Sequence, residues 1–473
     1  MAKGKHVDQI YTPVDASPVK SFFVTMLTRD IKLEEAILDL LDNCVDGVLR
    51  AKNVRANDKK PYSGFWADID FSSSAFSISD NCGGIPWDLH KYAFRMGRSN
   101  DRPHDTPGTV GVYGIGMKRA IFKMGESCQI QTQNKDNSYE VDISVAWVRD
   151  QTVWNIPVKK VSRKLAYDGT KVVVGNLLPG IATRFGDESQ AFTTELERMI
   201  SSHYAFIIDK GFTVKINGKI VLPKPTKLIF AKDTGPTSIR PFIFKTKIGG
   251  VSVFMAIGFT RGMPSQNEIK EEQEQTRYSS QEAGWTVLCN DRAVLYCDRT
   301  ELTGWGEAGV PRYHTQFIAI SGIVEFRAED ASELPTTTTK RGIDASSILY
   351  LQIKNKMREG LSLFTNYTNK WKGFEDEAKK HIESGTPLSF EEIKIEASKM
   401  NLRSITRSSM KGEQYRPDLP MPKKLEAKRK RISFVRDTSE VKLVSDYLFD
   451  DSDCEPDTVG EQCFELFLKE AKK

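Results

Sequence analysis

The stretch Ile37–Leu49 reads ILDLLDNCVDGVL and decides the fold of the N-terminal part of the chain. Wound as an α-helix at about 100° per residue, it places Asp39, Asn43 and Asp46 within roughly 60° of one another, opposite its apolar side chains. Asp and Asn are poor helix formers, because their side chains compete for backbone hydrogen bonds. The polar face is therefore either an unusual solvated surface or a set of short oxygen ligands suited to a hard cation and a positioned water.

Two glycine-rich stretches follow this helix. ISDNCGGIP, at Ile78–Pro86, indicates a strand that runs into a turn, with Asp80 just before the paired glycines. GVYGIGMKRA, at Gly111–Ala120, leaves backbone N–H groups uncovered at the start of a helix and contains Lys118. A phosphate binds favourably at such a helix start, and a lysine adds a point charge. A glycine triplet alone also occurs in ordinary turns, so only the combination of all three stretches is specific.

The composition is that of an ordinary globular protein with two or three domains. Of 473 residues, 39% are hydrophobic and 28% are charged, and the formal net charge is +5. We see no secretory signal and no run of about 18 apolar residues, so we expect no membrane span. The seven cysteines form no C-x-x-C pair, which favours a reducing compartment over a zinc site or disulfides. We expect a cytoplasmic protein, or a nuclear one if the source is eukaryotic.

Other nucleotide-binding classes lack their motifs in this sequence. The chain contains no G-x-x-x-x-G-K-[ST], which excludes a P-loop, and neither D-F-G nor H-R-D, which excludes a protein kinase. In their order, the three stretches instead resemble the motifs E-x-x-x-N-x-x-D, D-x-G-x-G and a glycine-rich lid of the GHKL ATPase superfamily. That superfamily includes gyrase-type topoisomerases, the large heat-shock chaperone, MutL and MORC proteins and sensor histidine kinases. A fourth family motif, G-T-x-V, recurs at Gly169–Val172.

The resemblance covers residues 21–180 and implies a Bergerat-type α/β sandwich that binds ATP and Mg²⁺. Gly111–Lys118 is most similar to the MORC-type branch. By this resemblance Asn43 would hold Mg²⁺, Asp39 would be the catalytic base that orients water, and Asp46 would support the pocket through water. The family usually has Glu where this chain has Asp39, so the resemblance predicts ATP binding more strongly than ATP hydrolysis.

The resemblance also assigns the base and phosphate contacts. Asp80 would accept the adenine amino group, Gly84 would let the base approach closely, and Thr170 would hydrogen-bond near it. Cys82 stands where the family motif has glycine, and the two glycines that follow it can still make the turn. The residues expected to bind the phosphates are Gly111, Gly114, Gly116 and Lys118.

Along the chain we predict an α+β protein in several parts. They are an arm at 1–20, the ATP-binding domain at 21–184, a transducer-like α+β domain at 185–344, a helical region at 345–400, a basic linker at 401–436, and an acidic tail with a short helix at 437–473. Many family members have a transducer domain that sends a lysine to the γ-phosphate. Lys340, after a Thr-rich loop, is our candidate for this catalytic lysine, with an ordinary surface loop as the alternative.

These features predict an ATP-dependent conformational switch that closes as a homodimeric clamp. Residues 401–436 hold 11 Lys and Arg against 3 Asp and Glu. Such a run is commonly a solvated linker, but contact with DNA through Arg403–Arg436 is the sharper hypothesis. Genome maintenance or anti-phage defence would fit by analogy. The alternative is a chaperone-like or signalling module that regulates a protein partner through the C-terminal helices without binding DNA.

Overall fold

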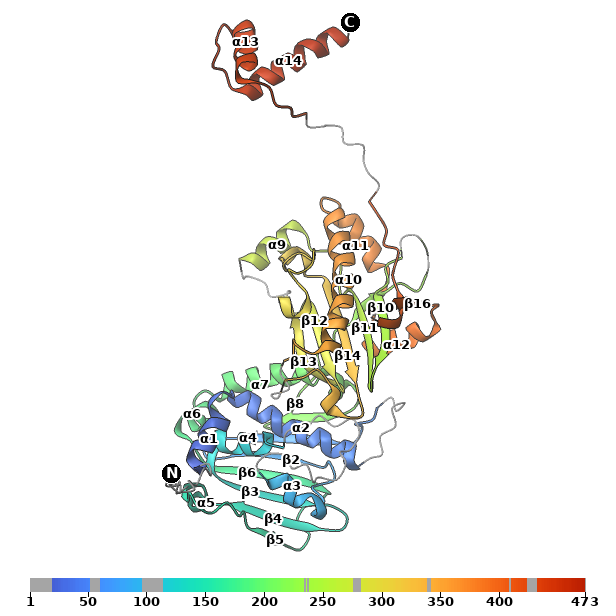
Figure 1. Ribbon diagram of the computed structural model, residues 1–473. Helices are drawn as coiled ribbons and strands as arrows, with labels where there is room; N and C mark the ends of the chain where they lie inside the picture. The colour runs from blue at the N-terminus through green and yellow to red at the C-terminus, as the bar shows by residue number, and fades with distance from the viewer. Residues whose placement is uncertain are drawn as a thin grey trace, which may run out of the picture. The chain divides into compact units, whose positions relative to one another are not determined.

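The computed structural model describes residues 19–51, 60–95, 114–233, 235, 238–274, 282–337, 342–407, 410–422 and 432–472. The chain forms two compact units, Met1–Pro422 and Lys423–Lys473. The fold is α+β, as the sequence predicts, with two large sheets in the first unit and helices in the second (Figure 1).

The N-terminal part of the first unit is built on an eight-stranded sheet with the order β5-β4-β3-β6-β2-β1-β7-β8. Neighbouring strands are antiparallel except β1 and β7, which are parallel. The strands are β1 (Trp66–Phe71), β2 (Phe76–Asp80), β3 (Gly125–Gln133), β4 (Ser138–Ile143), β5 (Val158–Lys160), β6 (Gly169–Leu177), β7 (Thr213–Ile216) and β8 (Lys219–Ile220). The helices are α1 (Lys20–Arg29), α2 (Leu33–Ala51), η1 (Trp87–Leu89), α3 (His90–Phe94), α4 (Gly116–Met124), α5 (Val145–Arg149), α6 (Pro179–Phe185), α7 (Ser189–His203) and α8 (Ala205–Asp209).

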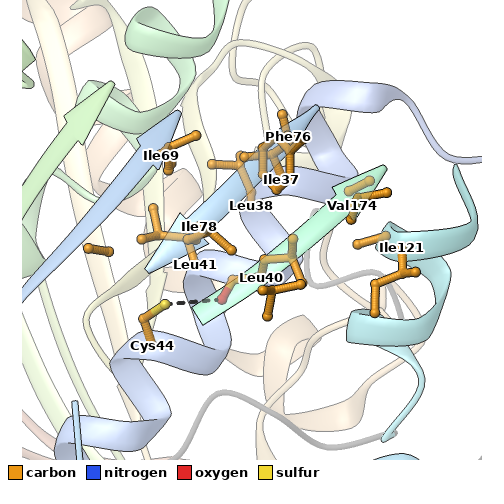
Figure 2. Close-up of a cluster of buried hydrophobic side chains, with 14 of the residues drawn as sticks. Ile37, Leu38, Leu40, Leu41, Cys44, Ile69, Phe76, Ile78, Ile121 and Val174 are labelled. Atoms are coloured by element: carbon orange, nitrogen blue, oxygen red, sulfur yellow. Dashed lines mark hydrogen bonds between the residues drawn. The ribbon is translucent and has the colours of Figure 1, made fainter. Parts of the chain in front are cut away.

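Helix α2 is held on this sheet by its apolar face. Ile37 and Leu41 are fully buried, and they lie with Ile69, Ile78 and Val174 in one cluster (Figure 2). Full burial of each such side chain contributes about 1.5–3 kcal/mol. This packing fixes the rotation of α2 about its axis and turns its polar face away from the sheet.

The second large sheet has the order β13-β12-β14-β11-β10-β17-β16, with α10 packed against it. Its strands are β10 (Phe242–Ile248), β11 (Val251–Phe259), β12 (Gly284–Cys289), β13 (Arg292–Asp298), β14 (Ile320–Arg327), β16 (Arg403–Arg407) and β17 (Met410–Tyr415). A small separate pair consists of β9 (Leu228–Phe230) and β15 (Thr386–Leu388). The helices of this part are α9 (Gln266–Gln273), η3 (Glu301–Thr303), η4 (Thr315–Phe317), η5 (Ala331–Glu333), α10 (Ile348–Lys370), α11 (Glu375–Glu383) and α12 (Phe390–Lys399).

Part of the segment expected to be a basic linker is folded. β17 pairs antiparallel with both β10 and β16 at the edge of the second sheet. The chain then lies along α10, where the Trp371 indole donates a hydrogen bond of 3.0 Å to the Pro420 carbonyl. An edge strand can direct charged side chains into solvent, so a high charge density does not oppose pairing there. Residues 423–431, which include the run KRKR, lie outside the described residues.

The second unit contains α13 (Thr438–Phe449) and α14 (Pro456–Ala471). Asp450 ends α13 in the left-handed conformation, and the Ser445 hydroxyl donates to the Asp451 carbonyl at 2.5 Å. The ion pair of Lys442 in α13 with Asp453, at 2.8 Å, also holds the segment between the two helices against α13. Across the part of the chain that the structure describes, we find no helix with the length and apolar content needed to cross a bilayer.

Candidate active site

The polar face of α2 combines buried carboxylates with an exposed amide. Asp39 and Asp46 are each only 4% exposed, whereas Asn43 between them is exposed. A solvated helix face would leave its carboxylates in water, because burying a charge without compensation is costly. The sequence prediction that these three residues share one face therefore agrees with the structure, in which the two carboxylates are buried and the amide of Asn43 reaches solvent.

Asp39 is paired with a cation from α4. The Arg119 guanidinium donates through Nη2 to Oδ2 of Asp39, and the two side chains are 12% and 5% exposed. Gly116 also faces Asp39, since a Cβ at that position would lie 3.4 Å from the same carboxylate oxygen, in ordinary van der Waals contact. The sequence analysis missed Arg119. Its spacing of three residues from Gly116 places both on one face of α4, which was the available signal.

Lys118, the cation that the sequence analysis selected, is directed elsewhere. It is 3% exposed, and its ammonium group donates to the Ala93 carbonyl at 2.8 Å and to the Gly114 carbonyl. These contacts tie the start of α4 to the end of α3. Gly114 has a φ of +68°, a conformation that glycine adopts readily. Two other predicted site residues, Gly111 and Lys340, lie outside the described residues.

Asp80 ends β2 and carries a buried carboxyl group. It is 8% exposed, and the backbone N–H of Cys82 donates to its Oδ1 at 2.8 Å. Burial raises the pKa of Asp80 to about 6, because the charged form loses its hydration. On the adjacent strand, Thr170 pairs with Asp80, and its hydroxyl lies 3.0 Å from that of Thr132. Asp80 and Thr170 are thus brought together, as predicted from their motifs.

Contacts within the chain explain why the turn after Asp80 contains glycines. Gly83 and Gly84 have φ values of +87° and +68°, in the left-handed region that favours glycine. A Cβ at Gly84 would lie 2.2 Å from the Gln133 carbonyl oxygen of β3. Cys82 is 1% exposed and packs against Gly47 of α2, where a Cβ would lie 2.7 Å from the Cys82 carbonyl oxygen. The turn therefore packs between α2 and β3, and its backbone conformation requires both glycines.

A metal ion at this site would depend on the nucleotide for most of its ligands. Among the described residues, no three His, Cys, Asp or Glu side chains form a group that could hold a metal. Asn43 offers one exposed amide oxygen beside two carboxylates. This donor set fits Mg²⁺, which typically takes one or two protein oxygens and completes its octahedron with phosphates and water.

The edge of the same polar face is joined to the second sheet. Asp42 of α2 accepts a hydrogen bond of 2.9 Å from Nε of Arg292, and these side chains are 2% and 1% exposed. The Tyr204 hydroxyl lies within hydrogen-bonding distance of two acceptors, the Asp42 carboxylate and, at 2.8 Å, the Leu38 carbonyl. The guanidinium lies 4.2 Å above the Tyr204 ring. This buried ion pair links residues 250 positions apart, and nothing in the sequence pattern predicted it.

A second charged contact anchors the same turn of the second sheet. Asp291, between β12 and β13, accepts hydrogen bonds from Lys210 at 2.6 Å and from the Tyr62 hydroxyl at 3.1 Å. Burial acts to raise the pKa of Asp291, but the charges of Arg327 and Lys210 hold that pKa below its usual value. The β12–β13 turn is therefore fixed to the N-terminal part through two adjacent residues, Asp291 and Arg292.

The buried carboxylates of α2, the glycine turn after Asp80 and the helix that begins at Gly116 all lie in one part of the chain, and this part is similar to a known class of ATPase domain. Residues 31–168 match the family model described as Histidine kinase-, DNA gyrase B-, and HSP90-like ATPase. The match includes α2, the Asp80 turn and α4, and it ends immediately before β6. It supports the GHKL resemblance and ATP binding by this part of the chain. A search of curated proteins found no match.

Proposed function

We propose that the protein is a Mg²⁺-dependent ATPase whose site is formed by α2, the turn after β2 and the start of α4. The observation that carries this proposal is the polar face of α2 within the matched region. There, Asp39 and Asp46 are buried while Asn43 opens to solvent. Short oxygen ligands on a helix fixed by its apolar face can hold a cation and a water in a constant geometry.

In this proposal the adenine end of ATP is recognised by Asp80. Its carboxylate accepts a hydrogen bond from the exocyclic amino group, which guanine lacks at the corresponding position, and Thr170 supports the base from the neighbouring strand. Asn43 would hold Mg²⁺, which when bound neutralises charge on the β- and γ-phosphates. In this proposal the phosphates would approach the start of α4 at Gly114 and Gly116, and Gly111, Lys118 and Lys340 are candidates from the resemblance alone.

Hydrolysis in this proposal is an in-line displacement by water. Asp39 orients the water, whose oxygen forms a bond to the γ-phosphorus. The bond from that phosphorus to the β–γ bridging oxygen breaks, and its electron pair leaves with ADP. The proton released by the water passes to the carboxylate of Asp39 or to phosphate and then to solvent. Asp46 would support the geometry from the next turn of the helix, through water.

The experiment that tests this proposal compares nucleotide binding with turnover. The Asp39→Asn variant keeps the shape of the side chain and removes its charge, so we expect turnover to fall by about 100-fold or more, with ADP affinity within about threefold of wild type. Calorimetric titration and phosphate release would measure the two quantities. Unchanged turnover would overturn the role of Asp39, and a wild-type protein that binds no adenine nucleotide would overturn the function.

Beyond the site, we propose that ATP binding closes a homodimeric clamp of the MORC type that acts on DNA, in genome maintenance or anti-phage defence. Residues 401–436 hold 11 cationic and 3 acidic side chains, and this net positive charge supports DNA as the partner. Neutralising Lys428–Arg431 removes four charges and should flatten the dependence of log affinity on log salt by about 3 to 4 units if all four contact phosphates. An absence of DNA binding at low salt would overturn this assignment. Light scattering with a non-hydrolysable ATP analogue tests closure into a dimer.

A protein partner is the second candidate, in which the ATPase is a chaperone-like or signalling module. The second unit supports it, because Leu443, Tyr447 and Phe467 are exposed on its helices by 74%, 86% and 74%. In this case the protein would not bind DNA, and removal of α13 and α14 would leave ATP turnover unchanged while abolishing the partner's effect on it. The DNA-binding measurement separates the two candidates.

A further inference from the structure

We propose that Arg119 is a further catalytic residue: it binds the terminal phosphate of ATP through Nε while Nη2 holds the carboxylate of Asp39. This inference rests on the proposed ATPase function and names a cation for its γ-phosphate. The motif resemblance assigns no role to Arg119.

The first observation is how Arg119 contacts Asp39. A guanidinium and a carboxylate often pair through two parallel hydrogen bonds. Here the structure gives one, from Nη2 of Arg119 to Oδ2 of Asp39. Oδ1 of Asp39 has no hydrogen-bond partner among the residues described, so it stays available to orient a water. Arg119 therefore fixes the position of the carboxylate without occupying both of its oxygens.

The second observation is an unused donor on the same guanidinium. The Nε–H of Arg119 is buried and reaches no acceptor within the described part of the chain. A buried donor without a partner costs about 1–3 kcal/mol, and more when the group is charged. The described part of the chain provides no acceptor for this donor. An anionic oxygen that arrives with a ligand would satisfy it.

The geometry of arginine places that acceptor beside Asp39. The guanidinium is planar, and its donors point in fixed directions. The Nε–H and one of the two N–H groups of Nη2 point to the same edge of the plane, so an oxygen bound at Nε lies close to a group bound at Nη2. Because Nη2 is bound to Asp39, the acceptor at Nε lies beside the carboxylate that would orient water. That is the place of the reacting phosphate.

The neighbouring groups agree with this assignment. Asn43 is one helical turn beyond Asp39 on α2, so a phosphate between them would contact a cation held by Asn43 on one side and Arg119 on the other. Lys118 donates to the carbonyls of Ala93 and Gly114, whereas Arg119 is the cation that contacts Asp39 among the residues that the structure describes. A cation on the γ-phosphate stabilises the charge that spreads over its oxygens during transfer.

The test compares a nucleotide that has the γ-phosphate with one that lacks it. In Arg119→Gln we expect ADP affinity within about threefold of wild type, affinity for a non-hydrolysable ATP analogue lower by about 10-fold or more, and kcat lower by about 100-fold or more. Arg119→Lys retains one positive charge but cannot donate to both groups in a fixed plane. It should recover part of the analogue affinity and little of the turnover.

Lys123→Gln is the matched control, because Lys123 lies on the same helix and donates to the Thr28 carbonyl at 3.0 Å. It should keep wild-type affinity and turnover. If Arg119 only fastens α4 to α2, Arg119→Gln will weaken ADP and the analogue equally and lower the unfolding temperature, which overturns the proposal. Turnover within about twofold of wild type overturns it as well. If the wild type binds and hydrolyses ATP and Arg119→Gln does too, only this inference fails, whereas a wild type that binds no nucleotide refutes the proposed function itself.

Discussion

Replacing Asp80 with asparagine should stabilise the nucleotide-free protein at neutral pH and at the same time weaken its binding of adenine nucleotides. Asp80 is 8% exposed, and its carboxyl accepts a hydrogen bond from the N–H of Cys82. Burial makes the charged form unfavourable before any ligand is present. Asparagine has the same shape and can accept the same hydrogen bond, but it carries no charge. The proposed contact with adenine and the stability of the nucleotide-free protein thus make opposite demands on this position.

The size of the effect follows from the pKa of Asp80, which burial raises from 3.8 to about 6. A shift of roughly two units corresponds to about 3 kcal/mol of unfolding free energy. The native state binds the proton more tightly than the unfolded state, so this contribution is present below pH 4 and is lost as the pH rises to 6. The Asp80→Asn variant does not titrate. The unfolding free energy of the variant should therefore be close to that of wild type at low pH. Above pH 6 it should exceed the wild-type value by up to about 3 kcal/mol, less the cost of burying the new amide N–H groups.

Denaturant titrations of both proteins at about pH 4.5 and about pH 8 measure this difference directly. Asp187→Asn, at an exposed position, controls for the loss of an acidic residue and should change stability equally at both pH values. Calorimetric titration with ADP should show a loss of affinity of about 30-fold or more in Asp80→Asn, since an amide accepts the adenine amino group less well than a carboxylate. A stability difference that does not grow with pH would refute the raised pKa of the buried Asp80 carboxyl. An unchanged ADP affinity would refute the contact of Asp80 with adenine.

Further predictions concern the buried ion pair and the glycine turn. Arg292→Met should lower the unfolding free energy by about 3–5 kcal/mol, because it leaves Asp42 charged and buried, whereas the double variant with Asp42→Leu should recover much of this loss. Additive losses in the double-mutant cycle, measured by denaturant titration, would contradict this coupling. Gly84→Ala should cost about 2 kcal/mol or more, since its Cβ would lie 2.2 Å from a carbonyl oxygen at a φ of +68°. Gly180→Ala in α6, where a Cβ meets nothing within 4 Å, should instead stabilise by up to about 1 kcal/mol, and equal effects of the two changes would refute the steric argument.

The features that the sequence predicted are those set by local chemistry. The apolar period of α2 fixed which side of the helix meets the sheet, and so placed Asp39, Asn43 and Asp46 together. The glycine pair after Asp80 predicted a turn because left-handed backbone favours glycine, and both residues adopt it. In each case the residues that determine the structure are neighbours along the chain.

The features that escaped prediction depend on how distant elements meet. Lys118 and Arg119 are adjacent cations, and only the rotation of α4 against α2 decides which one faces Asp39. The charge run after residue 401 indicated a linker, but pairing of β17 with β10 was determined by a free sheet edge formed more than 150 residues earlier. The contact of Asp42 with Arg292 likewise joins two parts of the chain that carry no mutual sequence signal.

These contacts make α2 a mechanical link between the candidate site and the second sheet. Asp39 is bound to α4 through Arg119, and Asp42, three residues later, is bound to the β12–β13 turn through Arg292. A helix is stiff over one turn, so a nucleotide that shifts Asp39 also shifts Asp42. The pair with Arg292 is 1–2% exposed, and separating it costs about 3–5 kcal/mol because water cannot replace either partner. When α2 is displaced slightly, moving the β12–β13 turn with it therefore costs less free energy than breaking the ion pair. We expect nucleotide binding to alter hydrogen exchange in β12 and β13, and Arg292→Met to abolish that change while leaving ADP affinity measurable.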